Sequence, residues 1–484
     1  MRAYSGSDSP SHQSLRTAFN EKFSTYFRSH CHDSISPYYI SWSEMIDIMA
    51  SVKLGKSSAG SLRPEHLIHG SEKLVLHLHL FFNSMIQHGF IVNDFLKGTI
   101  SPIVKDTEGD VTDATNYRPI TLGPLLAKLF EKAIDIKIEP FLTSDVLQFG
   151  FKKRTSTSHA LFVLKSTVNH FTENGSNVFV SFLDCTKAFD RVSHYGLFLK
   201  LMDRCIPLCL LLLIMVWHLN MSCRVKWGDA FSDEFDVPLG TKQGGIISPK
   251  LFSLYIDDMA AILRRKGLGC HFSKVFVGCI LFADDMALLA PSRSALQKMI
   301  NLCYDFCSKF CLSFNARKSK VMFFGKDTTE SLAPLSLNDS LIDYIEEWKY
   351  LGTTLKSGRK LSFVARPDLS SFYRASNSIL HSLPGAHEHT LVSLLYCNCL
   401  PVLTYACSVK EFSAAEMSNC NTAVNNALRK VFGFNRWESI RSLREFFGMR
   451  SLYEIFKSSQ DKFLISCRSH HNTIVSFIAS HLTY

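Results

Sequence analysis

Hydrophobic residues recur at helical spacing early in the chain. In the stretch 72–88, leucines and phenylalanines lie three or four positions apart, which predicts an amphipathic helix. Residues 40–100 have the same character, so we expect them to be mostly helical, with a Gly/Ser-rich loop at 56–61. Residues 1–36 are polar and rich in Ser and His, and they contain one predicted helix over 14–27.

Apolar segments with the character of strands follow this helical region. Residues 99–105 and 116–122 are two such segments joined by a polar turn, which predicts a hairpin. In residues 177–184 (NVFVSFLD), alternate side chains share one face of a predicted strand. Residues 276–290 predict a strand, a turn that contains two adjacent aspartates, and a second strand.

The same periodicities predict further elements. They are helices over 125–142, 206–219, 250–264 and 294–310, strands over 224–237, 320–324 and 348–355, and a mostly helical region over 365–484. The run 206–219 is the longest apolar one, and it is shorter than the roughly 20 residues that a spanning helix needs. We therefore expect no membrane span. Helices intermixed with strands indicate an α+β fold.

Composition narrows the class of protein only slightly. The chain has 484 residues, which suggests two to four domains. Hydrophobic residues make up 46% and charged residues 20%, and this balance excludes a largely disordered chain. The 53 basic and 43 acidic residues give a net charge of +10, a mild bias that permits a polyanionic partner without establishing one.

The cysteines and the N-terminus indicate the compartment. The 15 cysteines are scattered and many lie in apolar segments, which is typical of a reduced intracellular protein. Cys303, Cys307 and Cys311 are spaced as one stripe of a helix, so a role in the core is favoured over zinc binding. The polar N-terminus lacks the apolar region of a secretory signal. We expect an intracellular protein, in the nucleus or the cytoplasm.

Three carboxylates stand out because hydrophobic strand residues lead into them. Asp184 ends one predicted strand, and Asp284 and Asp285 lie within the apolar run 280–290. Carboxylates in apolar surroundings need compensation, which divalent cations with oxygen ligands can supply. Taken alone, the Asp-Asp pair is equally well explained as a turn, and Asp184 as a strand end or helix cap.

Other segments of the sequence decide between these interpretations. Phe182–Arg191 (FLDCTKAFDR), Pro238–Pro249 (PLGTKQGGIISP) and Phe282–Asp285 (FADD) resemble the three catalytic motifs of reverse transcriptases, in the order of that family. Four flanking segments are also similar to family motifs. They are Asn116–Ile120, Gln148–Phe151, Leu312–Ser319 and Tyr350–Gly352. The sequences of these motifs are most similar to those of non-LTR (LINE-type) retrotransposon polyproteins, and the resemblance covers about residues 45–360.

This resemblance implies a right-hand polymerase fold with fingers, a palm that contains an antiparallel sheet, and a helical thumb. The expected boundaries are a polar N-terminal extension over 1–44, fingers over 45–175, a palm over 176–347, and primer grip, helical thumb and C-terminal region over 348–484.

The resemblance also implies an activity. The chain would be an RNA-directed DNA polymerase that adds deoxynucleotides to a primer 3′-OH by two-metal-ion phosphoryl transfer with Mg²⁺ or Mn²⁺. Its partners would be an RNA template, a DNA primer and deoxynucleoside triphosphates. By analogy with the family, the metal ligands are Asp184, Asp284, Asp285 and the backbone carbonyl of Cys185, and Lys318 protonates the departing pyrophosphate.

The implied substrate contacts come from three sets of residues. Lys105 and Arg118 would bind the triphosphate, Phe189 would be the steric gate against a ribose 2′-OH, and Gln243 and Gly244 would form the turn under the nucleotide. The alternatives are a core Phe for Phe189, a solvated side chain for Lys105, Arg118 and Lys318, and a plain glycine turn for Gln243 and Gly244.

Other charged residues receive structural interpretations. Asp190 and Arg191 are expected to cap and brace the next helix, and the pair Asp257-Asp258 is expected to be structural. Residues 410–484 contain ten Lys/Arg and six Asp/Glu, which could follow a phosphate backbone or form a solvated helix face.

Two expected parts are missing from the sequence. The polar first 36 residues cannot hold the endonuclease that usually precedes this polymerase, and the C-terminal cysteines and histidines do not have the spacing of a zinc knuckle. The chain therefore resembles a fragment without endonuclease activity. A catalytically inactive RNA-binding remnant and an intron-maturase-type polymerase are the alternative functions.

Overall fold

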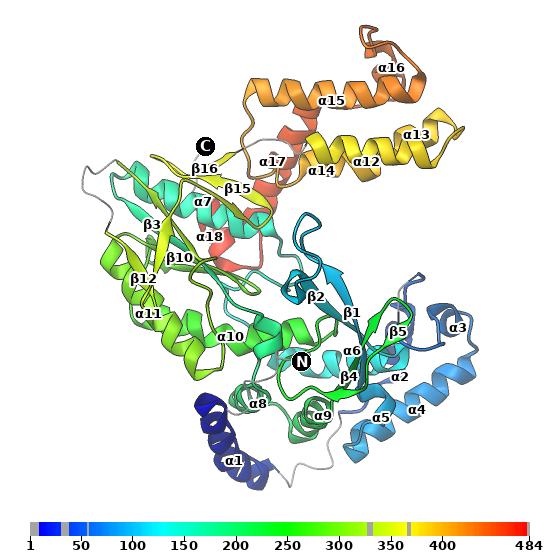
Figure 1. Cartoon of the computed structure of the whole chain (residues 1–484), viewed down its shortest axis with the longest axis vertical. Coiled ribbons are helices and arrows are strands. Elements are labelled where there is room, and N and C mark those ends of the chain that lie inside the picture. Colours follow the sequence, from blue (N-terminus) through cyan, green and yellow to red (C-terminus); the bar gives the residue numbers. More distant parts are fainter. Residues whose placement is uncertain (1–8, 31–37, 56–57, 327–332, 365–368, 482–484) are drawn as a thin grey trace.

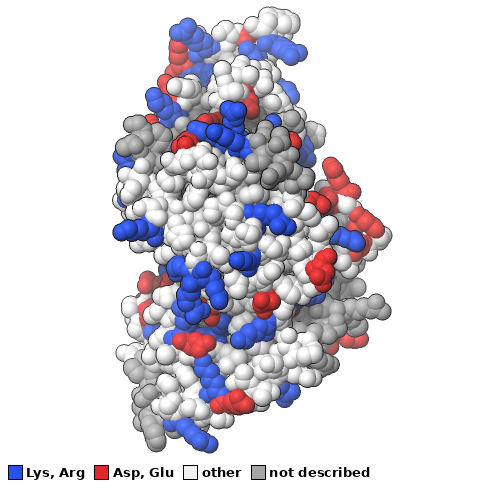
Figure 2. Space-filling view, turned by 90° about the vertical axis from the view of Figure 1, so that its left-hand side faces the viewer, with Lys and Arg blue, Asp and Glu red and all other residues white. Residues whose placement is uncertain are grey.

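The computed structural model describes residues 9–30, 38–55, 58–326, 333–364 and 369–481. Sheets and helices form a broad body, from which helices near the C-terminus project at one end (Figure 1). On the face shown in Figure 2, Lys and Arg side chains gather most densely in the lower middle, with Asp and Glu side chains among them. The charge of this face is therefore mixed, in keeping with the modest net charge of +10.

Five helices come first along the chain. They are α1 (Pro10–His30), α2 (Trp42–Ala50), α3 (Pro64–Ile68), α4 (Glu72–His88) and α5 (Asn93–Leu96). The predicted helices over 14–27 and 72–88 are confirmed as α1 and α4. Helix α4 ends at Gly89, whose φ of 63° is a left-handed conformation that glycine adopts without strain.

A five-stranded sheet, which we call the outer sheet, follows. Its strands are β1 (Lys97–Val104), β2 (Tyr117–Leu122), β4 (Ser222–Trp227), β5 (Ala230–Phe231) and β6 (Phe235–Asp236). The predicted hairpin is confirmed, since β1 and β2 pair in antiparallel register. Strand β4 pairs with β1 in parallel, although its sequence lies inside the range expected for the palm. The expected domain boundaries stay predictions.

A six-stranded sheet, which we call the central sheet, holds the middle of the molecule. Its order is β12-β13-β11-β3-β10-β9. The strands are β3 (Val178–Asp184), β9 (Cys279–Phe282), β10 (Asp285–Ala290), β11 (Lys320–Phe324), β12 (Leu335–Leu337) and β13 (Ser340–Tyr344). Strand β3 is antiparallel to both β10 and β11 and is buried from Val178 to Leu183, which explains its nearly continuous apolar sequence.

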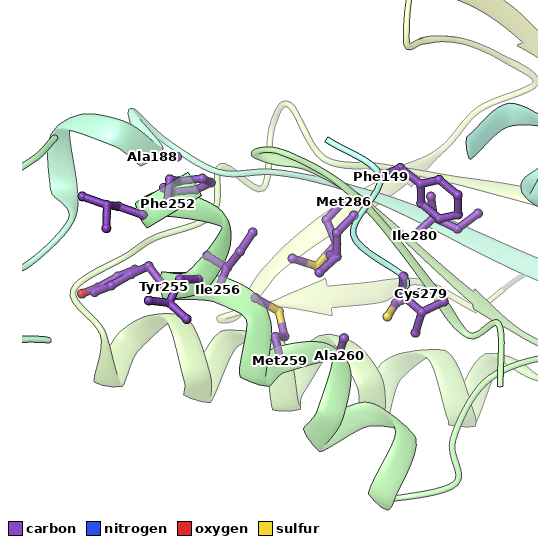
Figure 3. Packing of buried hydrophobic residues seen from close by; sticks show 14 of the residues in the cluster. Phe149, Ala188, Phe252, Tyr255, Ile256, Met259, Ala260, Cys279, Ile280 and Met286 are labelled. Atoms are coloured by element: carbon purple, nitrogen blue, oxygen red, sulfur yellow. The ribbon is translucent and has the colours of Figure 1, made fainter. Parts of the chain in front are cut away.

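Helices surround the two sheets. They are α6 (Leu125–Ile138), α7 (Thr157–Glu173), α8 (His194–Asp203), α9 (Leu208–Leu219), α10 (Ser248–Arg265) and α11 (Arg293–Lys309). Figure 3 shows Ile256 and Met259 of α10 packed near Met286 of β10, within the main hydrophobic core. Cys303 and Cys307 of α11 are buried in the same core, so the structural interpretation of that stripe is confirmed.

The longest apolar run forms the buried helix α9. No helix among the described residues is long and apolar enough to cross a membrane. Helix α8, which precedes α9, was not predicted from the sequence.

Two small sheets complete the β structure. The hairpin of β7 (His271–Phe272) and β8 (Val275–Phe276) is one, and β14 (Glu347–Tyr350), β15 (Thr353–Lys356) and β16 (Ser362–Val364) form the other. The ring centroid of Tyr350 lies 4.9 Å from that of Phe182 on β3. The three-stranded sheet therefore lies against the face of β3 that also carries Asp184, because side chains two apart on a strand share a face.

The C-terminal region is helical, as predicted. Its helices are α12 (Leu369–Ser382), α13 (Glu388–Leu394), a π-helix (Leu395–Cys399), α14 (Leu400–Thr404), α15 (Ala414–Phe432), α16 (Arg441–Phe446), α17 (Leu452–Arg468) and α18 (Thr473–His481). Helices α12–α16, which we call the C-terminal helical unit, share a second hydrophobic core around Phe372, Cys420 and Leu428. Helix α18 returns to pack on α7.

Candidate active site

Strand register brings the three predicted carboxylates to one corner of the central sheet. Asp184 is the last residue of β3, and it pairs with Asp285, the first residue of β10. Paired residues of antiparallel strands place their Cβ atoms roughly 5 Å apart on one face. Asp284 lies in the two-residue turn between β9 and β10, next to Ala283, whose φ is 58°.

Burial acts on all three carboxyl groups, and repulsion from neighbouring carboxylates acts on Asp184 and Asp285. Burial raises the pKa of Asp184, and the neighbouring Asp284 raises it further. Burial, followed by repulsion from Asp284 and Asp184, raises the pKa of Asp285 to about 6. Burial also raises the pKa of Asp284, while Arg118 lowers it. The corner thus holds negative charge that the nearby cations offset only in part.

The loop after α11 fixes the end of β3. The backbone N–H of Asn315 donates to the carbonyl of Asp184 over 2.9 Å, and that of Thr186 donates to the carbonyl of Ser313 over 2.9 Å. These two hydrogen bonds form an isolated antiparallel β-bridge, in which Cys185 lies opposite Phe314. Because successive carbonyls of a strand point to opposite edges, the carbonyl of Cys185 points toward the edge where β10 begins. It can therefore act as an oxygen ligand together with the carboxylates.

These residues supply oxygen donors of the kind that Mg²⁺ prefers. No three His, Cys, Asp or Glu side chains in the described part of the chain are grouped so that they could hold a metal ion together. Mg²⁺ is usually bound through one or two carboxylates plus substrate phosphates, and such a site needs no closed protein cage. Burial raises the pKa of the Cys185 thiol to about 12, so its sulfur is no competing thiolate ligand.

The glycine-rich loop 240–245 packs onto the short helix Ala188–Arg191 that follows β3. The N–H of Gly240 donates to the carbonyl of Val192 and that of Thr241 to the carbonyl of Phe189, both over 2.8 Å. A Cβ on Gly240 would lie 2.9 Å from the carbonyl oxygen of Asp190, and the φ of 93° also favours glycine. This close approach explains why glycine occupies the position.

Gln243 and Gly244 connect this loop to the outer sheet. The amide of Gln243 donates to Asp190 Oδ1 over 2.7 Å, and its backbone carbonyl accepts from the N–H of Thr121 on β2 over 2.7 Å. Gly244 has a φ of 110°, and a Cβ there would lie 3.0 Å from the Thr121 carbonyl oxygen. The loop is therefore held between β2 and the helix that carries Phe189.

The predicted capping role of Asp190 and Arg191 is wrong. Ser193 caps α8 by accepting from the N–H of Gly196, whereas Asp190 binds Gln243 and Arg191 donates to Ser313 Oγ over 2.7 Å. Both side chains therefore connect loops of the site instead of capping a helix.

The structural interpretation of Asp257 and Asp258 is confirmed. Asp257 forms an ion pair with Arg204, and Asp258 forms one with Lys200.

Cations gather beside the carboxylates. Lys105 Nζ donates to the carbonyl of Thr115 over 2.8 Å. Burial lowers the pKa of Lys105, and the positive charges of Lys318, Lys187 and Arg118 lower it further. Lys318 and Lys105 in turn lower the pKa of Asp184. The three predicted cations are thus brought together, and Lys187, which the sequence reasoning missed although it lies in the first motif, joins them.

Phe189 lies between rings. Its ring is stacked on Phe252 with centroids 4.6 Å apart, and it meets Phe151 edge-on at 6.1 Å. The half-buried side chain thus combines core packing with a place at the site, and its role as a gate stays a prediction.

Residues 103–355 match the family model described as reverse transcriptase (RNA-dependent DNA polymerase). The chain belongs to this family. It is similar to the RNA-directed DNA polymerase from mobile element jockey of Drosophila funebris, with 26% identity over 381 residues, and to that of Drosophila melanogaster, with 29% over 334 residues. These matches cover 75% and 66% of this chain but only 40% and 35% of the relatives, so the chain spans less than half of their length.

A solved structure of telomerase from Candida albicans aligns with 89% of this chain and 71% of its own, at 11% identity and a TM-score of 0.40. The family match confirms the predicted resemblance to reverse transcriptases and, with it, the right-hand polymerase fold.

One contribution to this reverse transcriptase site was missed by the sequence reasoning. The side-chain oxygen of the buried Gln148 accepts from the N–H of Gly150 over 2.8 Å and from that of Ala283 over 3.1 Å. The backbone N–H of Phe149 also donates to the carbonyl of Leu281 over 2.7 Å. The segment 147–150 therefore braces the outer edge of the hairpin that carries Asp284. The Gln-Phe-Gly-Phe motif marked this segment as part of the family pattern, but it did not show that Gln148 binds Ala283.

Proposed function

We propose that this chain is the polymerase part of a non-LTR retrotransposon protein that copies RNA into DNA. The observation that carries the proposal is the register of β3 with β10, which sets Asp184 beside the Asp284-Asp285 turn. Four cations next to this corner make it suited to a negatively charged triphosphate. Family membership and the names of the similar proteins support the same activity.

Each side chain has a distinct part in the proposed reaction. Arg118 and Lys105, with Lys187, bind and orient the phosphates of the incoming nucleotide. Loop 240–245 supports the nucleotide, and its attachment to β2 and to Asp190 keeps it in place. Phe189 excludes a ribose 2′-OH by its bulk.

Asp184 and Asp284, with Asp285 and the carbonyl of Cys185, would hold Mg²⁺ or Mn²⁺, which neutralises developing charge on the reacting oxygens when bound. Lys318, whose charge lowers the pKa of Asp184, would give a proton to the departing pyrophosphate. Most of the acceleration in such a reaction comes from positioning and from stabilisation of charge.

The partners follow from this activity. They are an RNA template, a DNA primer and deoxynucleoside triphosphates, within the cell. We propose that cleavage of a target DNA is carried out by residues other than 1–484. An inactive remnant is less favoured, because all three acids are present and the segments that hold them pair as a site requires. The similar proteins are polymerases of mobile elements, which disfavours a maturase.

Primer extension tests the proposal. Purified protein with oligo(dT)-primed poly(rA), dTTP and Mg²⁺ or Mn²⁺ should yield extended primer. The double substitution Asp284→Asn, Asp285→Asn should reduce extension by about 10³-fold or more, because it removes charge stabilisation of several kcal/mol. Asp461→Asn, an exposed position on α17, is the matched control. Equal extension by the double variant and the wild type would remove the assignment of the carboxylates.

A further inference from the structure

A groove lies in the C-terminal region, at a distance from the carboxylate corner. It has a volume of about 420 Å³ and is bounded by α13, the π-helix, the turn after α16 and the first turn of α17. Its lining includes His389, Tyr396, Phe447, Arg450 and Ile455. Figure 1 shows α13 and α16 at the far end of the C-terminal helical unit, away from β3 and β10.

Aromatic rings continue from the groove to the open surface. Phe447 lies 5.9 Å from the ring of His389 and meets Phe446 edge-on at 5.2 Å, measured between ring centroids. Phe446 and Trp437 are each 83% exposed, more than any other large hydrophobic residue of the described chain. Contiguous exposed apolar surface marks interaction sites, and the adjoining rings of Phe446 and Phe447 offer a partner flat apolar faces.

The charged residues next to these rings in the sequence are of both signs, with Arg in the majority. Arg450 lines the groove and is exposed. Burial raises the pKa of Tyr396, and the charge of Arg444 opposes this shift, which places the Arg444 guanidinium near the phenol. None of the residues that line the groove is Asp or Glu.

The nearby acids are engaged. Glu445, next to Phe446, forms an ion pair with Arg441. Glu454 accepts from the N–H of Ser451 over 2.9 Å. The hydrogen bonds from Ser451, and then the charges of Arg450 and Arg444, lower the pKa of Glu454.

The backbone supplies a separate indication. Tyr396 belongs to the π-helix between α13 and α14. π-Helical turns are rare and frequently occur at functional sites, because the extra residue turns side chains away from their helical positions. Here the π-helix places a Tyr on the wall of the groove.

We propose that this groove and the neighbouring ring of Phe446 bind single-stranded nucleic acid. A base stacks in the groove against Tyr396 and Phe447, a phosphate binds Arg450, and a following base stacks on Phe446. Stacking on aromatic rings together with cationic contacts to phosphates is the usual chemistry of single-strand recognition. Paired bases hide the faces that these rings would contact.

A protein partner fits the groove less well. An apolar helix or strand would cover Phe446 but would bring no anion to the exposed Arg450, whose neighbouring acid is Glu454. Nucleic acid provides both the flat apolar faces and the negative charge. The site lies outside the carboxylate corner, so the proposal does not depend on polymerase activity.

Binding to the full chain tests the proposal. Fluorescein-labelled rA12 and dA12 are titrated with protein whose polymerase cleft has been saturated with an unlabelled RNA–DNA duplex, and anisotropy is recorded. Phe446→Ala and Arg450→Gln should each weaken binding by roughly tenfold, in keeping with the contribution of one stacked base or one phosphate contact. The relative affinities for rA12 and dA12 show whether the strand is RNA or DNA.

Matched controls keep the result interpretable. Tyr39→Ala removes another exposed aromatic ring, and Arg468→Gln removes an exposed Arg at the other end of α17. Both should bind like the wild type. Phe446 and Arg450 are exposed, so their variants should also melt like the wild type, which excludes unfolding as the cause.

The proposal is overturned if Phe446→Ala and Arg450→Gln bind both oligonucleotides as tightly as the wild type. It is also overturned if they weaken only binding of the duplex, or if they change only self-association of the protein. Extension of a short primed template should be retained by both variants. Loss of extension in the wild type itself would reject the proposed polymerase but would leave the binding result standing.

Discussion

The carboxylate corner and the C-terminal helical unit both carry charged side chains, but they hold them differently. At the corner, segments far apart in sequence fix each other, as in the bonds of Ala283 to Gln148 and of Gln243 to Asp190. In the helical unit, most Arg side chains bond to residues close by in the sequence, as Arg441 does to Glu445, although Arg444 also reaches Asn425 on α15. Long-range bonds preorganise a site for chemistry, whereas local bonds leave a surface able to adapt to a flexible ligand.

Separate hydrophobic cores underlie this difference, and the strongest test is to damage one of them. Phe372 is 2% exposed and lies in the core of the C-terminal helical unit. Phe372→Ala should destabilise that unit by about 3–5 kcal/mol, because a large buried ring is replaced by a cavity. Urea unfolding followed by hydrogen exchange should then show early opening of α12–α16 while β3 and β10 stay protected.

The matched variant is Phe198→Ala, which truncates a ring of the main core on α8. It should lower the protection of the central sheet instead. If Phe372→Ala lowered protection equally in both regions, the two cores would be one cooperative unit and the comparison would fail.

The second test concerns the preorganised corner. A Cβ on Gly150 would lie 2.4 Å from the backbone nitrogen of Ala283, closer than atoms can approach. Gly150→Ala should therefore displace the turn that carries Asp284, and a displacement of about 1 Å can reduce catalysis by about 10²-fold. Single-turnover primer extension measures this effect.

Gly123→Ala is the control, since nothing lies within 4 Å of a Cβ at that position. It should extend primers at the wild-type rate. Wild-type extension by Gly150→Ala would show that the segment 147–150 does not position the turn.

The sequence alone predicted those structural elements that depend on residues close together in the chain. Alternating apolar residues predicted the strand that ends at Asp184, and the apolar segments around Asp284 and Asp285 predicted a hairpin turn. The helical spacing of 72–88 predicted α4 with both its ends. These features depend on periodicity and turn chemistry within a few residues, which a single sequence displays directly.

Long-range contacts could not be derived in this way. Nothing in the residues of β4 indicates that it pairs with β1 in parallel, because the pairing depends on how the intervening helices return the chain. The same holds for Gln148, whose partner Ala283 is distant in sequence, and for Asp190, which suits a helix cap as well as a bond to Gln243. Local propensity for these residues was overridden by tertiary packing.

A third test weakens the corner more mildly. Asp190→Ala removes the acceptor of the Gln243 amide and leaves loop 240–245 held by backbone bonds alone. We expect KM for dTTP to rise about tenfold, because one charge-assisted hydrogen bond of roughly 1.5 kcal/mol or more is lost, with a smaller change in kcat. Steady-state kinetics on primed poly(rA) separates the two.

Asp190→Asn keeps an oxygen that can accept from Gln243, so it should recover part of the affinity for dTTP. If the Ala and Asn variants had the same KM, the charge of Asp190 beside Lys187 and Lys105 would matter and the bond to Gln243 would not.

The smallest expected effect lies where the C-terminal chain returns to the body. His159 on α7 packs against His470 and Phe463, with ring centroids 4.4 and 5.0 Å apart. Burial, with the nearby His470 and His471, lowers the pKa of His159 to about 4, below the ordinary value of 6.5. Between these values the unfolded chain binds a proton that the folded protein does not. The free energy of unfolding should therefore decrease as the pH falls from 6.5 toward 4.

His159→Gln should flatten this dependence in urea unfolding between pH 7.5 and 4.5. His194 and His218 are also buried with lowered pKa values and act in the same direction. The comparison is therefore between the slopes of the free energy of unfolding against pH in the wild type and in the variant. His88→Gln, at an exposed position on α4, should keep the wild-type slope. If the pH dependence of the free energy of unfolding were the same for His159→Gln and the wild type, protonation of His159 would not affect the contact between α7 and the α17–α18 connection.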